Sequence, residues 1–297
     1  MRYNNTETFI KGVIGMFVFD IDIVKDLHFF HLVSNETPMQ SQHIVHSHTY
    51  CELYFFVGGE CSYIVENGVY KPRKGTVIFT RPGEMHGIHI NADCTYERYY
   101  FSIIPDIVKT LDAPEFLRCF YNRPHGQQNT IDLPPEISEH CFSLLEKINT
   151  LMEQNQPDAK PLALAAFLEI LHDINCCVDN PHQLSERAEQ NLLVNRAMRY
   201  INQNLAEIRS TADIAAALYV QREYLSRKFS EHTGIPLSRY ITLKRIARAK
   251  TELVQEKSIA EVCTLCGWKD YSYFITVFRR EVGMTPMQFK KNHKTME

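Results

Sequence analysis

The sequence lacks the short motifs that mark several common enzyme classes. It has no glycine-rich phosphate loop, no HExxH zinc motif and no GxSxG nucleophile motif. It also has no run of 18 apolar residues, and the segment Met1 to Asp20 has no basic stretch followed by a small-residue cleavage site. These absences argue against the hydrolases that use such motifs. They predict a cytoplasmic protein without a membrane partner.

Paired cysteines are scarce, although the chain has nine cysteines. With no export signal, we expect these thiols to stay reduced. Cys263 and Cys266 form the only CxxC pair. Such a pair can be a redox motif or half of a zinc site, but no second pair completes a zinc site and no βαβ pattern surrounds it. We interpret both cysteines as small buried side chains of a helix.

Charge is distributed unevenly along the chain. The 297 residues are 44% apolar and carry a net charge of −3, and this length suggests about two domains. Residues 191–297 contain 18 Lys and Arg against 10 Asp and Glu, whereas the preceding residues contain 14 against 25. A basic module behind an acidic one predicts that only the C-terminal part binds a polyanion.

The N-terminal two thirds divide into a strand-rich and a helical part. Residues from about 10 to 104 are rich in Val, Ile, Phe and Tyr and are interrupted by turn signals such as Arg81-Pro82-Gly83, which predicts a β-sandwich or barrel. From Pro134 to Cys177, apolar residues recur at helical spacing on both sides of Gln156-Pro157-Asp158, which predicts two helices. The polar residues 179–190 predict a linker.

The C-terminal third contains an internal repeat. The pattern Leu225-x3-Phe229-x4-Gly234-x-Pro236 recurs 49 residues later as Phe274-x3-Phe278-x4-Gly283-x2-Pro286. In each copy a short apolar helix and a tight turn precede an amphipathic helix, as in a helix-turn-helix unit. Asp270 is a suitable N-cap for the second amphipathic helix. Two ordinary helical hairpins are the alternative, but a fixed offset inside the only basic region favours two DNA-binding units.

Helical spacing indicates which side chains of the two amphipathic helices face outward. The apolar residue pairs spaced four apart point inward, so the opposite face is free to read bases. The outward residues are Arg222, Glu223, Ser226 and Arg227 on the first helix, and Tyr271, Ser272 and Thr276 on the second. Four further cations are interpreted as phosphate contacts or solvated surface, namely Lys228, Lys244, Arg279 and Arg280.

These residues together resemble the AraC/XylS family of bacterial transcription regulators. The resemblance is carried mainly by Tyr224-Leu225-Ser226-Arg227-Lys228-Phe229, Thr233-Gly234, Cys266-Gly267-Trp268, Ser272-Tyr273-Phe274 and Gly283-Met284-Thr285-Pro286. The family implies two helix-turn-helix units bridged by one long helix, here about Leu237 to Val254, with recognition helices in successive major-groove segments. It also implies promoter DNA and RNA polymerase as partners, and a homodimer held by the helices of residues 134–177.

The strand-rich region contains a second constellation of polar residues. The pattern is His46-x-His48-x3-Glu52-x6-Gly59, followed by Gly75 and by Pro82-Gly83-x2-His86. A period of two places His46, His48, Tyr50, Glu52, Tyr54 and Phe56 on one face, and Cys51, Leu53, Phe55 and Val57 on the other. The pattern resembles the cupin barrel, whose metal-binding members hold a divalent ion with His, His, Glu and a later His. Such ligands do not select one metal.

Several roles are open to this constellation: an effector pocket, a metal-assisted pocket, an active metalloenzyme site or a structural polar cluster. We favour an effector pocket formed by His46, His48, Glu52, Tyr54 and His86, with a divalent metal at His46, His48, Glu52 and His86 as the second option. No catalytic residue and no firm cofactor are predicted.

The sequence therefore predicts an α+β chain of two domains. Residues 1–178 form a cupin-like sensing domain with a helical dimerisation segment at 134–177, and residues 191–297 form an all-α double helix-turn-helix domain. The predicted function is that of a ligand-responsive, sequence-specific activator of genes for uptake or metabolism of a small molecule such as a sugar. The alternative is a cupin metalloenzyme fused to a DNA-binding module.

Overall fold

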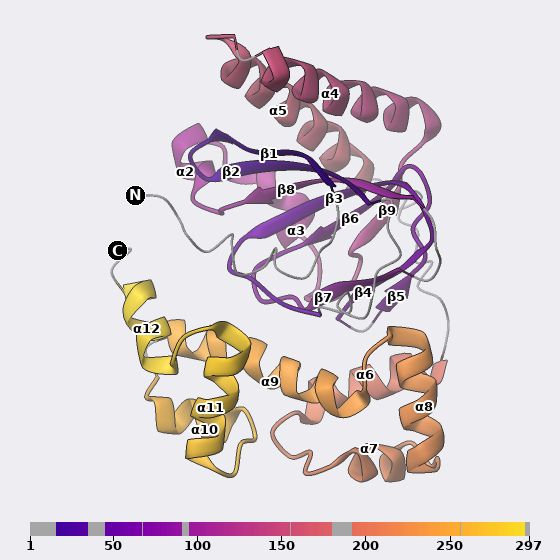
Figure 1. Ribbon diagram of the computed structural model, residues 1–297, viewed down its shortest axis with the longest axis vertical. Coiled ribbons are helices and arrows are strands. Elements are labelled where there is room, and N and C mark those ends of the chain that lie inside the picture. Colours follow the sequence, from indigo (N-terminus) through magenta and orange to yellow (C-terminus); the bar gives the residue numbers. More distant parts are fainter. Residues whose placement is uncertain are drawn as a thin grey trace.

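The computed structural model describes most of the chain as successive layers (Figure 1). A helical hairpin lies at one end, two β-sheets lie in the middle and a helical domain lies at the other end. The described residues are 16–34, 45–66, 68–90, 95–154, 156–179, 192–255 and 257–294. The predicted linker lies outside them except for Asp179.

The described strands form two antiparallel sheets. The larger sheet has the order β1-β2-β8-β3-β6-β9 and the smaller has the order β5-β4-β7. The strands are β1 (Met16–Val24), β2 (Leu27–Ser34), β3 (Cys51–Gly58), β4 (Cys61–Val65), β5 (Gly68–Tyr70), β6 (Thr76–Thr80), β7 (His86–Ile90), β8 (Tyr96–Ile103) and β9 (Thr130–Asp132). The predicted cupin-like barrel is not closed by the described strands, which pair into two separate sheets.

Alternation along β3 builds a core on each face of the larger sheet. Cys51, Leu53 and Phe55 pack outward in one apolar cluster with the helical hairpin, whereas Tyr54 and Phe56 point between the two sheets. The predicted division of this strand into two faces is confirmed. Both faces are buried, so the strand shows no solvent-exposed side.

The helical hairpin covers the outer face of the larger sheet. It consists of α4 (Pro135–Gln154) and α5 (Ala159–Val178), and it is preceded by α2 (Ile107–Leu111), the 3-10 turn η1 (Pro114–Leu117) and α3 (Arg118–Tyr121). The two predicted helices and the break between them are confirmed. Helix α5 is long and apolar enough to satisfy a length and hydropathy criterion for a membrane span, which alone is a weak indication, and its buried side packs on the sheet.

The apolar stripes of this hairpin are largely used inside the chain. Leu144, Leu145, Ile148, Phe167 and Leu171 are all buried in the cluster that covers the larger sheet. These residues are therefore used inside the chain, and the homodimer of the hairpin stays a prediction. An apolar helix face indicates that something packs on it, but not whether that is a sheet of the same chain or a second chain.

The C-terminal domain contains two helix-turn-helix units joined by one helix. Its helices are α6 (Leu192–Asn204), α7 (Thr211–Ala217), α8 (Arg222–Thr233), α9 (Leu237–Val254), α10 (Ile259–Leu265), α11 (Tyr271–Val282) and α12 (Pro286–Lys294). Helix α9 has the predicted bounds and contributes to both cores. Local signals set the ends of α11: the carboxylate of Asp270 accepts the amide of Tyr273 at 2.7 Å, and Gly283 ends the helix with a φ of 81°.

The first helix-turn-helix unit shares its core with the smaller sheet. Ile64 and Val69 from the outer face of that sheet, together with Val45 and Met85, belong to the same apolar cluster as α6 to α9. The second unit has a separate core, which also buries Cys263 and Cys266 as predicted. The first unit is therefore anchored to the β-domain, and the second is joined to it through α9.

Candidate functional site

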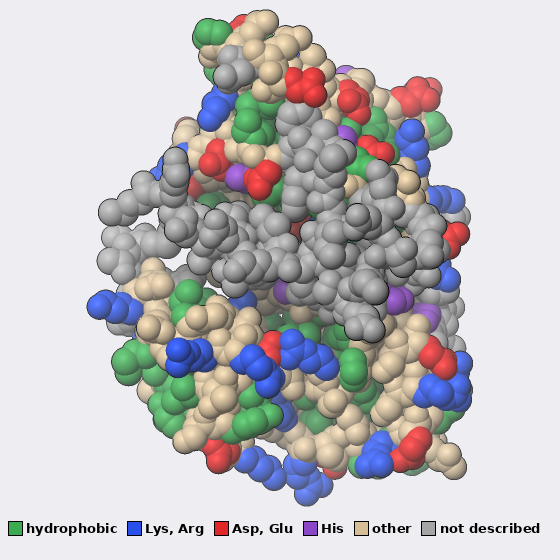
Figure 2. All heavy atoms as spheres, in the orientation of Figure 1, with side chains coloured by type: hydrophobic (Ala, Val, Ile, Leu, Met, Phe, Trp, Pro, Cys, Tyr) green, Lys and Arg blue, Asp and Glu red, His purple; other side chains and the backbone are tan. Residues whose placement is uncertain are grey.

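The outer faces of α8 and α11 carry the predicted base-reading residues. Leu225 and Phe229 are fully buried, and so are Phe274 and Phe278, which confirms the inward faces. On the outer faces Ser226 is partly exposed, and the other predicted residues are exposed, namely Arg222, Glu223, Arg227, Tyr271, Ser272 and Thr276. Basic side chains gather mainly over this end of the molecule and acidic ones over the hairpin (Figure 2). Contact with DNA remains a prediction.

Two of these arginines form ion pairs on the surface of α8. Arg227 Nη1 lies 3.1 Å from Glu231 Oε1, and Arg222 Nη2 lies 2.8 Å from Glu223 Oε1. All four side chains are largely exposed, so each pair contributes little to stability. The guanidinium groups can therefore exchange these carboxylates for base edges or phosphates at small cost.

Lys244 does not lie where the sequence suggested. It is only 9% exposed and forms an ion pair with Glu66 of the β-domain. Helix α9 packs on more than one side, so its helical period does not identify a free face. The interpretation of Lys244 as a phosphate contact or solvated side chain was wrong, whereas Arg279 and Arg280 are exposed as expected.

Glu66 joins the two domains. It follows β4 with a φ of 46° and is 2% exposed. Its carboxylate accepts hydrogen bonds from the Met85 amide at 2.6 Å and from Asn202 Nδ2 at 3.2 Å, in addition to the ion pair with Lys244. Its carbonyl accepts the Tyr240 hydroxyl at 2.7 Å. One buried residue thus holds α6, α9 and the segment before β7 together.

The four predicted ligand residues of the β-domain converge. Each of them offers one atom that could ligate a metal, and these four atoms lie within 4.8 Å of one another. The residues are His46, His48, Glu52 and His86. Nε2 of His48 lies 3.5 Å from the Glu52 carboxylate and Nε2 of His86 lies 3.9 Å from it. Tyr63 donates its hydroxyl to Glu52 at 3.2 Å. We call these four residues the polar cluster.

Backbone carbonyls orient the imidazoles of His48 and His86. Nδ1 of His48 bonds to the Tyr50 carbonyl at 2.8 Å, and Nδ1 of His86 bonds to the Glu84 carbonyl at 3.0 Å. Because a carbonyl only accepts, each neutral ring carries its proton on Nδ1 and presents the lone pair of Nε2 to the cluster. Both Nε2 atoms are buried and have no hydrogen-bond partner among the described residues.

Electrostatics make the polar cluster a group of acceptors. Burial lowers the pKa of His48 to about 4, so this imidazole is neutral near pH 7. Burial also opposes ionisation of Glu52, but His48, His86 and Arg98 outweigh it and hold the pKa of Glu52 below its ordinary value. Lone pairs of nitrogen and a carboxylate suit either a divalent metal or the hydroxyl or ammonium donors of an organic ligand.

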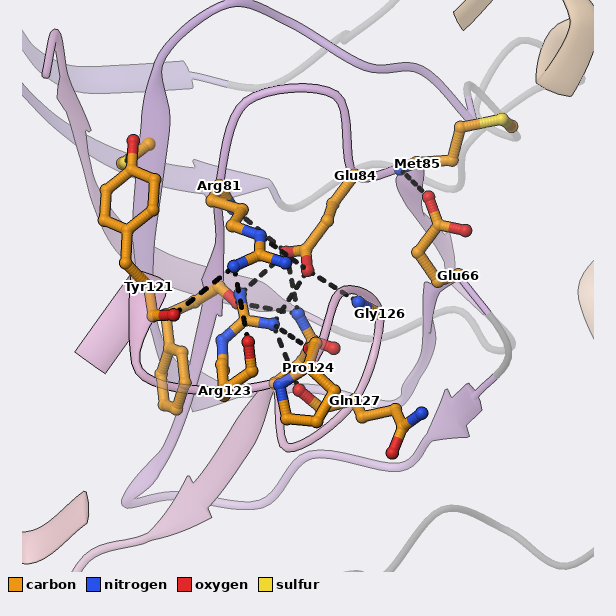
Figure 3. A network of polar contacts seen from close by, with 12 residues as sticks. Glu66, Arg81, Glu84, Met85, Tyr121, Arg123, Pro124, Gly126 and Gln127 are labelled. Atoms are coloured by element: carbon orange, nitrogen blue, oxygen red, sulfur yellow. Dashed lines mark hydrogen bonds and ion pairs between the residues drawn. The ribbon is translucent and has the colours of Figure 1, made fainter. Parts of the chain in front are cut away.

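A buried ion-pair network fixes the turn in front of His86 (Figure 3). The Glu84 carboxylate accepts two hydrogen bonds from Arg123, each 2.7 Å long, and further bonds from the Gly126 amide at 2.7 Å and Asn129 Nδ2 at 3.0 Å. Both charged side chains are almost completely buried. Because the Glu84 carbonyl orients the His86 ring, this network also supports the polar cluster.

Two of the residues missed by sequence reasoning are Arg98 and Glu66. Arg98 lies between the sheets, on the same face of β8 as Tyr96 and Tyr100. The sequence did carry a signal for it, because Arg98 lies two residues from a tyrosine on either side and so shares their face of the strand. Tyr54 was predicted as an effector contact, but it is fully buried and its hydroxyl bonds to that of Tyr96. No local signal identified Glu66, whose partners on α9 are up to 178 residues away.

Comparisons with known proteins match both halves of the chain. The model of the AraC-like ligand binding domain matches residues 32–171, and that of a helix-turn-helix domain matches residues 214–292. The HTH-type transcriptional activator RhaR of Enterobacter sp. (strain 638) is 23% identical over 253 residues, which cover 82% of this chain and 86% of that protein. RhaS of the same strain is 24% identical over 255 residues, with coverages of 83% and 87%.

Two of the solved structures with similarity to this chain cover a little more than a third of it. A DNA-binding transcriptional dual regulator from Escherichia coli K-12 is 32% identical, with 37% of this chain and 99% of that chain covered and a TM-score of 0.34. A transcriptional regulator from Chromobacterium violaceum is 28% identical, with coverages of 37% and 100% and a TM-score of 0.35.

Proposed function

The chain belongs to the AraC-type transcription regulators, with a ligand-binding domain in front of a DNA-binding domain, and on this premise we propose that its polar cluster is the effector site and that an effector acts on DNA binding through α9. The regulator is not an enzyme. We further propose that it is a cytoplasmic activator that binds promoter DNA, contacts RNA polymerase and controls genes for a small polar metabolite such as a sugar.

The observation that carries this proposal is the bonding between the polar cluster and α9. Ser47 lies between two cluster histidines, and its carbonyl accepts Nζ of Lys250 at 3.0 Å. Met85 precedes His86, and its amide donates to Glu66, the partner of Lys244. The segments that carry the cluster therefore bond to the helix that joins both helix-turn-helix units.

This bonding gives the effector a route to the DNA-binding domain. An effector shifts an equilibrium only if it binds two arrangements with different affinity. A ligand that changes the separation of His48 and His86 also moves Ser47 and Met85, because each is the chain neighbour of a cluster residue. The docked arrangement of α9 then gains or loses stability when the effector binds.

The polar cluster also fits a divalent metal ion. His46, His48, Glu52 and His86 would hold it, and the carbonyl bonds to Nδ1 are the outer contacts that orient metal-binding histidines. A bound ion would supply a fixed positive charge for an effector oxygen. The residues of the chain would still orient the effector and transmit its binding to α9.

Within the DNA-binding domain, we propose that α8 carries most sequence discrimination. Arg227 can pair with guanine, helped by Arg222, Glu223 and Ser226, whereas the exposed face of α11 offers Tyr271, Ser272 and Thr276 for weaker edge or phosphate contacts. A homodimer would have to use the outer side of the hairpin, where Leu162 is 39% exposed.

The proposal is tested by selecting binding sites from randomised DNA with the purified full chain. The wild type should select a defined sequence, and Arg227→Ala should lose about 1–3 kcal/mol on it and relax the preference at one or two base pairs. Arg279→Ala is the control, expected to weaken all sequences alike. If Arg227→Ala also weakened all sequences alike, Arg227 would be a phosphate contact.

The effector site is tested with His48→Ala and with Thr49→Ala, an exposed neighbour, as the control. Cells carrying a reporter behind the selected site are grown on a panel of carbon sources. His48→Ala should lose the response while keeping DNA binding, and Thr49→Ala should keep both. An unchanged response of His48→Ala would exclude the polar cluster as the effector site. Elemental analysis of protein purified without chelators tests the metal: one ion per chain that is lost in His86→Ala would support it, and its absence would leave the cluster as a site for the effector alone.

A further inference from the structure

Arg98 is a cation placed between the two sheets. Its Cζ lies 4.8 Å from the ring centre of Tyr100, 5.7 Å from that of Tyr54 and 5.8 Å from that of Tyr96. Guanidinium groups stack favourably on aromatic faces in this way.

Arg98 has no carboxylate partner among the described residues. It forms no ion pair within 4 Å there, and its Nε is buried without a hydrogen-bond partner in the part of the chain that the structure describes. By contrast, the buried Arg123 pairs with Glu84. Arg98 is only partly exposed, and Glu52, which lies beyond ion-pair distance, is the described carboxylate whose charge acts on it, so its own charge is only partly balanced.

Arg98 and the polar cluster lie along one face of the larger sheet. Glu52 pairs across the sheet with Ser102, and Arg98 is four residues away from Ser102 along β8, a Cα distance of roughly 13 Å. Tyr50 and Tyr100 are both partly exposed and lie near Glu52. Arg98 and the polar cluster therefore lie towards the two ends of one sheet face.

The two ends have opposite hydrogen-bonding character. The polar cluster offers acceptors, from the lone pairs of His48 and His86 to the carboxylate of Glu52. Arg98 offers only donors and a permanent positive charge. We propose that Arg98 binds the carboxylate of the effector, and that the effector is a small polyhydroxy acid whose hydroxyl groups face the polar cluster. This inference rests on the proposed function of the cluster as the effector site.

A carboxylate fits Arg98 better than a neutral hydroxyl does. The planar guanidinium group can donate two parallel hydrogen bonds to a carboxylate, and such charge-assisted bonds are roughly twice as strong as neutral ones. The hydroxyls of the same ligand would satisfy the two buried Nε2 atoms. One molecule of this class would thus meet the unsatisfied groups at both ends.

The test uses the full chain, treated with a chelator and dialysed, and sugars matched to their acids. The probes are glucose against glucuronate and gluconate, and galactose against galacturonate, measured by isothermal titration. At least one acid should bind at least tenfold more tightly than its neutral sugar. Arg98→Met should remove this preference and Arg98→Lys should keep part of it. Arg73→Met, an exposed arginine of the same domain, is the control and should keep all of it.

Absence of acid binding, or equal binding by wild type and Arg98→Met, would overturn the inference.

DNA binding on the selected site separates the two proposals. If neutral sugars bind and change DNA affinity while the acids do not, the inference on Arg98 fails and the proposed function stands. If the acids bind through Arg98 without any change in DNA affinity, the inference stands and the proposed coupling fails.

Discussion

The ion pair between Glu66 and Lys244 is expected to control how firmly the two domains dock. Among the described residues, replacing Lys244 by Met leaves the Glu66 carboxylate with the Met85 amide and Asn202 as donors, in a site where Glu66 is 2% exposed. Breaking a buried pair by removing one partner costs about 3–5 kcal/mol, since the remaining charge is uncompensated. Each 1.4 kcal/mol is a factor of ten, so the docking equilibrium should fall roughly 10²–10⁴-fold.

Hydrogen exchange of the full chain measures this change directly. Amides around Met85 and on α9 should exchange faster in Lys244→Met than in the wild type. Arg248→Met is the matched control on the same helix. Arg248 pairs with Glu252 at the surface, so its replacement should change the free energy of docking by less than about 1 kcal/mol. The double variant Glu66→Gln/Lys244→Met should recover much of the loss, since no charge is then left unpaired.

Two results would refute this reasoning. Unchanged exchange at both segments in Lys244→Met would mean that the pair does not hold the domains together. Strictly additive losses in the single and double variants would mean that Glu66 and Lys244 do not interact, because residues in contact show a coupling energy in such a cycle.

Three further predictions concern stability. Glu84→Ala should lower the free energy of unfolding of the β-domain in urea by about 3–5 kcal/mol, because it leaves the buried guanidinium group of Arg123 without its carboxylate. Gly267→Ala should destabilise more than Gly283→Ala in thermal unfolding: both have positive φ, but only at Gly267 would a Cβ lie 2.7 Å from the Ala206 carbonyl. Burial lowers the pKa of Lys250 to about 8 from 10.5, so the unfolded chain binds more protons between these values. The stability of the wild type relative to Lys250→Met should therefore rise between pH 7.5 and 9.5.

The helical part of the fold was predictable because its signals are local. The bounds of α9 and the N-cap at Asp270 follow from period, capping residues and the glycines that end α8 and α11. The alternation along β3 was also predictable, since successive side chains of a strand point to opposite faces. The convergence of the polar cluster came from a family pattern and was confirmed by the geometry.

The remaining features depend on contacts that no local pattern encodes. The pairing of β3 with both β6 and β8 and the split into two sheets are long-range choices among strands of similar composition. Lys244 looked like a surface cation because the face of α9 that it occupies is covered by a distant turn. The apolar faces of α4 and α5 predicted burial correctly, but the sequence did not specify that the larger sheet would cover them.

The placement of Ser47 imposes a thermodynamic condition on the proposed regulation. Its chain neighbours His46 and His48 belong to the polar cluster, while its carbonyl accepts a hydrogen bond from Lys250 of α9. Effector binding and domain docking thus share a three-residue segment, and their coupling free energy must be the same in both directions. If an effector weakens docking, then undocking must strengthen effector binding by the same factor. Lys250→Met, which loses the bond to Ser47, should therefore bind the effector more tightly if the effector releases α9, and less tightly if the effector holds it.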